Sequence, residues 1–79
     1  MNNPRKFDLF VDGEKFEWPQ ETISGAQLRQ LAAIPDNAQI FEHVPGKPDV
    51  EVLNNTVVNL EDHHGPVKFS TQSPGSQAG

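Results

Sequence analysis

The chain has 79 residues, a formal net charge of −5 and no cysteine. This length allows one hydrophobic core, and the lack of cysteine excludes a disulfide framework, a thiolate zinc site and a thiol nucleophile. The six basic residues are scattered, so no cationic stripe is available for nucleic acid. No apolar run approaches a membrane span or a signal-peptide core, so we expect a cytoplasmic protein that binds neither nucleic acid nor membrane.

The first apolar segment is typical of a β-hairpin. Residues 6–11 carry apolar side chains at alternate positions, which is the period of a half-buried strand. Asp12-Gly13 supplies the positive φ of a two-residue turn, residues 14–18 alternate again, and Pro19 ends the second strand. A calcium loop is the alternative reading of Asp12, but no further oxygen ligands follow at regular spacing.

A short helix is predicted after the hairpin. Ser24 as N-cap and Gln27 three residues later form a capping box, with Ile23 placed to pack against the first turn. The apolar stripe of this helix consists of Leu28, Leu31 and Ala32. Because a residue before proline avoids the α region, Pro35 should end the helix after two to three turns.

The rest of the apolar sequence predicts further strands. Residues 38–44 read as a third strand, 50–53 as a short extended piece and 67–70 as a final strand. Residues 56–60 fit either a strand or a tight connecting turn. A last strand beside the first would run parallel to it, giving a mixed sheet of four to five strands with one helix across it. The predicted fold class is α+β, in the β-grasp arrangement.

Composition divides the chain into three parts. Residues 1–5 should be a flexible N-terminus and residues 6–70 the folded domain. Residues 71–79 contain only Ser, Thr, Gln, Gly, Pro and Ala, which bury too little apolar area to offset the entropy of ordering. We therefore expect a flexible C-terminal tail that ends in glycine.

The folded part offers no candidate active site. Its polar residues match no familiar triad or metal spacing. Adjacent histidines in a strand-like segment point apart, so His63-His64 reads as a solvated loop in preference to a metal site. His43 is expected at an exposed position of the third strand, with a pH-sensitive contact as the alternative. We predict that the protein is not an enzyme and holds no metal and no cofactor.

The tail carries the candidate reactive group. A terminal glycine presents a carboxylate without a side chain on its α-carbon, so Gly79 can pass through a narrow slot into another protein's catalytic centre. Ser76, Gln77 and Ala78 would thread behind it. Residues 70–79, fully extended, reach about 33 Å, enough for the folded part to dock outside that enzyme.

Several segments resemble the bacterial multiubiquitin family. They are residues 10–19 (FVDGEKFEWP), 23–32 (ISGAQLRQLA), 44–49 (VPGKPD) and 67–69 (VKF), which together span nearly all of the folded part. The family is similar to ubiquitin in fold and is encoded beside proteins similar to ubiquitin-activating enzymes, conjugating enzymes and metal-dependent deubiquitinases. Such operons are similar to antiphage defence systems.

The resemblance implies a covalent protein modifier. Gly79 would be adenylated by an activating enzyme that uses ATP, passed as a thioester to enzyme cysteines and joined to an amine on an unknown protein target, so that every nucleophile belongs to a partner. Ubiquitin also docks partners on an exposed apolar patch of its sheet. Phe10 and Phe41, with His43, are the candidates for that surface here, and strand register decides whether each faces outward.

Two other functions stay open. Small β-grasp proteins with a C-terminal glycine also carry sulfur as a thiocarboxylate for cofactor synthesis. A non-covalent interaction domain would use the sheet to dock a partner and would not use the tail.

Overall fold

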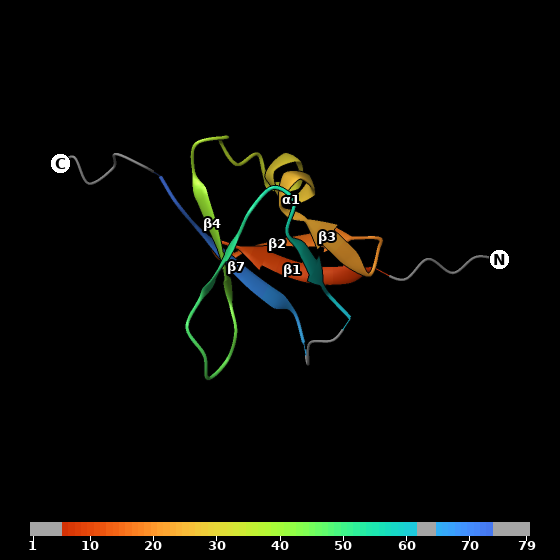
Figure 1. Ribbon diagram of the computed structural model, residues 1–79. Helices are drawn as coiled ribbons and strands as arrows, with labels where there is room; N and C mark the ends of the chain where they lie inside the picture. The colour runs from red at the N-terminus through yellow and green to blue at the C-terminus, as the bar shows by residue number, and fades with distance from the viewer. Residues whose placement is uncertain (1–5, 62–64, 74–79) are drawn as a thin grey trace.

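The computed structural model describes residues 6–61 and 65–73. The described part contains one helix and several short strands (Figure 1). In chain order they are β1 (Phe7–Val11), β2 (Glu14–Trp18), β3 (Thr22–Ser24), α1 (Gly25–Ala32), β4 (Gln39–His43), β5 (Val50–Val52), β6 (Val57–Asn59) and β7 (Val67–Gln72).

The main sheet has the strand order β2-β1-β7-β4-β5. β1 pairs antiparallel with β2 and parallel with β7, and β7 pairs antiparallel with β4. The last strand therefore lies in the centre of the sheet, between the first strand and β4. This mixed five-stranded sheet with a single helix confirms the predicted α+β, ubiquitin-like β-grasp fold.

The hairpin turn forms as predicted. Asp12 and Gly13 both have positive φ, 52° and 86° respectively, as a tight turn between antiparallel strands requires. At the far end of the hairpin, the Trp18 indole N–H donates to the carbonyl of Thr22 at 2.8 Å. That bond ties the end of β2 to the start of β3.

The helix begins with the predicted capping box. Ser24 Oγ accepts from the Gln27 backbone N–H at 3.1 Å, and Gln27 Oε1 accepts from the Ser24 backbone N–H at 2.9 Å. The next two N–H groups, of Gly25 and Ala26, donate to the carbonyls of Thr56 and Asn54. The first turn of α1 is therefore satisfied partly by its own cap and partly by the loop after β5.

Gly25 allows this close approach. A Cβ built at Gly25 would overlap the carbonyl oxygen of Leu53, so no larger residue fits without moving the loop. The helix ends at Ala32, and Ala33 closes it in the left-handed conformation with φ of 56°.

The core lies between α1 and one face of the main sheet. Leu28 of the predicted apolar stripe is fully buried, and Leu31 and Ala32 pack against the core cluster. The fully buried large side chains are Leu9, Ile23, Leu28, Ile40, Val52 and Phe69. Alternate residues of each sheet strand therefore face the helix.

Two elements differ from the sequence-based expectation. The sequence pattern does not predict β3, which pairs antiparallel with β6 as a separate two-stranded sheet. This pairing shows that residues 57–59, for which the sequence allowed a strand or a turn, form a strand. β7 runs to Gln72, beyond the expected end at Ser70. Its register with β4 continues through Ile40↔Thr71 and Gln39↔Gln72, so backbone pairing holds two polar residues that composition assigned to the tail.

Candidate functional site

Within residues 6–61 and 65–73, no helix lies on the face of the main sheet opposite α1 (Figure 1). Phe10 lies between the buried Leu9 and Val11 of β1, so its side chain points to this second face. Phe41 follows the fully buried Ile40 of β4 and points the same way. Both rings are half-buried and neither belongs to the core cluster. The structure therefore places both predicted aromatic residues outside the core.

The strand register relates these residues to one another. Phe10 pairs with Lys68 of β7, and Lys68 pairs in turn with His43 of β4. Phe41 pairs with Ser70, the next residue of β7 that faces the same way. We call these five residues the uncovered face: Phe10, Phe41, His43, Lys68 and Ser70. They bring the three predicted docking residues onto one surface across three neighbouring strands.

Ion pairs and hydrogen bonds border the uncovered face. Lys15 lies 3.7 Å from Asp8, and Lys6 lies 3.8 Å from Glu17, both across the β1–β2 pair. On the other border, His43 Nδ1 lies 2.9 Å from Asp49 Oδ1. These contacts are exposed and contribute little to folding free energy.

Lys68 differs from the other lysines near this face. No side chain in the ranges 6–61 and 65–73 pairs with its ammonium group. It lies between Phe10 and His43 in the register. The uncovered face thus combines two apolar rings with an ammonium group that is available to an acidic partner.

A second feature lies where β7 approaches its C-terminal end. The Asp12 carboxylate accepts a hydrogen bond from the Thr71 backbone N–H at 2.9 Å and another from the Thr71 hydroxyl at 2.5 Å. The Asp12 N–H donates to the carbonyl of Phe69 at 2.9 Å. The Asp12 side chain thus continues the β1–β7 pairing beyond the last paired backbone residue of β1 and holds Thr71 against the hairpin turn.

The predicted reactive residues lie beyond this point. Gly79, and the threading residues Ser76, Gln77 and Ala78, are outside the described residues. His63 and His64 also lie outside them. In the described ranges, no group of three or more His, Asp or Glu side chains is arranged to hold a metal ion, and no helix is long and apolar enough to cross a membrane.

Sequence reasoning missed Asp12, Lys68 and Thr71 as members of these sites. Asp12 is a common residue in a two-residue hairpin turn, so its local pattern already had an explanation. Its contact with Thr71 depends on the parallel pairing of β1 with β7, and no local pattern reports that pairing. The predicted parallel return of the last strand was the available signal, because it brings the hairpin turn beside the end of β7.

Comparison with known proteins identifies one family. A family model described as Multiubiquitin matches residues 7–71, which is most of the chain and all but the last residue of the main sheet. No curated protein and no solved structure gave a match.

Proposed function

Because this chain belongs to the multiubiquitin family, we propose that it is a ubiquitin-like protein modifier with Gly79 as its acyl donor. In the first step, the Gly79 carboxylate attacks the α-phosphate of ATP on an activating enzyme, which gives an acyl adenylate and releases pyrophosphate. A cysteine thiolate of that enzyme then displaces AMP and forms a thioester. The reaction runs in the cytoplasm, where ATP is supplied.

The acyl group then moves to its target. A conjugating-enzyme thiolate takes it by exchange of thioesters, and a target amine attacks the carbonyl, forms an amide bond and releases the thiol. A metal-dependent deubiquitinase-like protease would hydrolyse that amide. The chain supplies the carboxyl group in each step, and its partners supply the nucleophiles.

The observation that carries this proposal is the position of β7. It is the last strand and lies in the centre of the sheet, with its final residues fixed on one side by β4 and on the other by Asp12. Ser76, Gln77 and Ala78, which carry no charge, would then cross the narrow entrance of the partner's active site. A rigid domain with a short polar extension suits an acyl donor, because the domain docks while the extension reaches the catalytic centre.

The uncovered face is the proposed docking surface for the conjugating or deconjugating partners. Phe10 and Phe41 offer apolar contact area, and Lys68 offers a cation beside Phe10. Aromatic side chains are enriched at protein interaction surfaces. The complementary partner surface is apolar with a carboxylate opposite Lys68.

Reconstitution with cognate activating and conjugating enzymes tests the function. The chain has no Lys or Arg after Lys68, so trypsin would leave residues 69–79 attached to each modified lysine through Gly79. Mass spectrometry of the digested products should find this branched remnant when ATP is present and should find none when ATP is omitted. A thiocarboxylate at Gly79, with no branched peptide, would instead identify a sulfur carrier, and neither product would favour a non-covalent interaction domain.

A further inference from the structure

A second surface lies on the opposite, helix-covered side of the sheet. α1 ends at Ala32, before it reaches the end of β7, and leaves a cavity of about 220 Å³ between the helix end and the hairpin. We call it the hairpin pocket. Its apolar wall consists of Val11, Phe16, Ala32, Ile34 and Pro35. A water molecule occupies about 30 Å³ of liquid, so the pocket has room for one long side chain.

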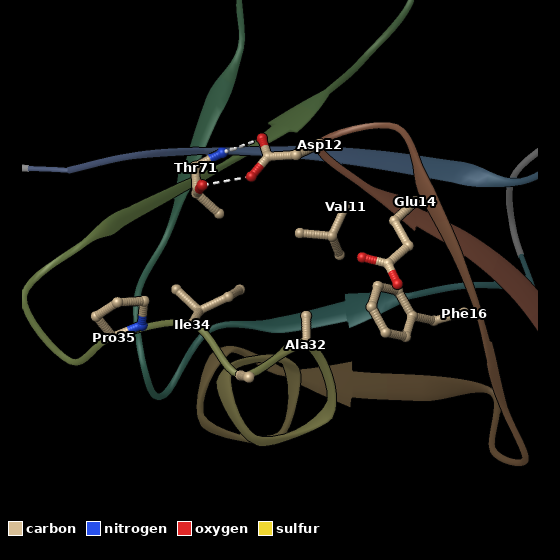
Figure 2. Close-up of a pocket in the computed structure, with 9 residues that line it drawn as sticks. Val11, Asp12, Glu14, Phe16, Ala32, Ile34, Pro35 and Thr71 are labelled. Carbon is tan, nitrogen blue, oxygen red and sulfur yellow. Dashed lines mark hydrogen bonds between the residues drawn. The ribbon is translucent and has the colours of Figure 1, made fainter.

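Glu14 is the unusual residue of this pocket. It pairs with Val11 in the hairpin, and in β2 it alternates with Phe16 and Trp18 toward the helix-covered face. Figure 2 shows its carboxylate beside the Phe16 ring, with Val11, Ile34 and Ala32 around the same hollow. Glu14 is exposed, so its carboxylate lies at the open rim of this hollow and next to its apolar side chains.

The Glu14 carboxylate lacks a partner within the described residues. No group in 6–61 or 65–73 forms a hydrogen bond or an ion pair with it. Lys15 faces the other side of the sheet and pairs with Asp8. On the helix, Arg29 is held by Asn54 Oδ1 at 2.8 Å and by the Pro35 carbonyl at 2.6 Å. The pocket therefore combines apolar walls with a carboxylate that its own chain does not neutralise.

A second negative charge lies at the same rim. Asp12 lines the pocket, and its carboxylate accepts only from the neutral groups of Thr71, so its charge is not compensated by these bonds. A basic side chain with an apolar stem complements this arrangement: the stem contacts the apolar wall and the cation meets the carboxylates. The guanidinium group of arginine complements the pocket better than the ammonium group of lysine. A guanidinium plane stacks on an aromatic ring, and its paired N–H groups bind a carboxylate.

We infer that the hairpin pocket binds an arginine side chain of the partner that receives the C-terminal tail. Thr71, two residues before the described range ends at Ser73, lines the pocket. A protein that holds the tail therefore has its surface beside the pocket. The identity of that partner rests on the proposed function, whereas the arginine specificity rests on the pocket alone.

Titration with N-acetyl-arginine amide, followed by amide NMR shifts of the full chain, tests this inference. We expect saturating shifts at Ala32, Ala33 and Thr71, and none with the neutral isostere N-acetyl-citrulline amide. Glu14→Gln should lower the affinity of the chain for the arginine probe about two- to fivefold, which is the contribution expected of an exposed ion pair. Glu17→Gln is the matched control, since Glu17 lies on the same strand but faces the other side and pairs with Lys6, and it should change nothing.

The inference would be overturned by equal shifts with the citrulline probe, by unchanged affinity in Glu14→Gln, or by no shift at these amides with about 50 mM probe, a concentration that fills more than half of a site with a Kd of about 30 mM. Shifts of the same amides on dilution without any probe would assign the pocket to a second copy of the chain, and would also contradict it. No enzyme or ATP is present in this titration, so its failure leaves the acyl-donor proposal untouched.

Discussion

Asp12 and Thr71 are 59 positions apart in the sequence and are joined by two hydrogen bonds, from the Thr71 N–H and the Thr71 hydroxyl to the two oxygens of one carboxylate. Asp12 also has a left-handed backbone, with φ of 52°, which directs its side chain from the hairpin turn toward β7. The turn that closes the first hairpin therefore also holds the end of the last strand. We call this contact the Asp12–Thr71 clamp.

Removal of the clamp should loosen the end of β7. Asp12→Asn keeps a residue that tolerates the left-handed conformation but removes the charge from both bonds. We expect a loss of about 1 kcal/mol in the free energy of unfolding by urea denaturation, with faster hydrogen exchange at the Thr71 amide. Asp8→Asn is the matched control, because it removes only an exposed ion pair and should cost less than about 0.5 kcal/mol. Equal effects of the two variants would contradict the role of the clamp.

Gly25 should be intolerant of the smallest substitution. Alanine is favoured over glycine in a helix by about 1 kcal/mol, yet a Cβ here would overlap the Leu53 carbonyl. We predict that Gly25→Ala destabilises the protein by about 2 kcal/mol, since the loop after β5 must move.

Gly46→Ala serves as its comparison in thermal or urea unfolding. Gly46 has a positive φ of 78° but no atom near its missing Cβ, so only backbone strain of about 1 kcal/mol should appear. A stabilised Gly25→Ala variant would show that the approach of the loop to the helix is not as close as described.

Ile40 and Phe41 are neighbours in β4 that should behave in opposite ways. Ile40 is 0% exposed and in the core, so Ile40→Ala should lower the free energy of unfolding by about 2 to 5 kcal/mol. Phe41 lies on the uncovered face and outside the core cluster, so Phe41→Ala should cost less than about 1.5 kcal/mol. If Phe41→Ala proved as destabilising as Ile40→Ala, the second face of the sheet would not be free for a partner.

The uncovered face should affect transfer more than activation or folding. We predict that the double variant Phe10→Ala with Phe41→Ala keeps the fold but lowers the rate of transfer to a target about tenfold or more, as the loss of two anchoring side chains at an interface does. Single-turnover transfer from a preloaded conjugating enzyme measures this step. Gln30→Ala is the control, because Gln30 is exposed on α1, on the other side of the sheet. Equal rates for the double variant and the control would remove the uncovered face from the docking step.

The sequence predicted the parts of the fold that depend on local chemistry. Asp12-Gly13 as a turn, Ser24 with Gln27 as a capping box, and the alternation in β1 and β2 are short-range patterns, and the structure confirms them. β3 was missed because its three residues precede the helix and pair with β6, a strand 35 residues along, without a local turn signal. The extension of β7 was missed because Thr71 and Gln72 have tail-like composition and are held by strand pairing alone.

In the candidate sites, too, the sequence predicted what depends on local patterns and missed what depends on contacts between distant segments. Phe10 and Phe41 were candidates from the sequence, but their common face follows from the register of three strands. Glu14 reads in sequence as the solvated side of a hairpin strand. It borders the hairpin pocket because α1 ends at Ala32, which the sequence pattern does not relate to Glu14. The predicted roles of residues 76–79 stay predictions that chemistry must test.

The most direct measurement is thioester formation between this chain and its cognate activating enzyme. With ATP present, we expect a product of higher mass on a non-reducing gel that disappears on addition of a thiol reductant. Deletion of Gly79 should abolish it, whereas Glu17→Gln, which changes an exposed residue of β2 that pairs with Lys6, should leave it unchanged. If the chain without Gly79 formed the same reductant-sensitive product at the same rate, Gly79 would not be the acyl donor and the central claim would be wrong.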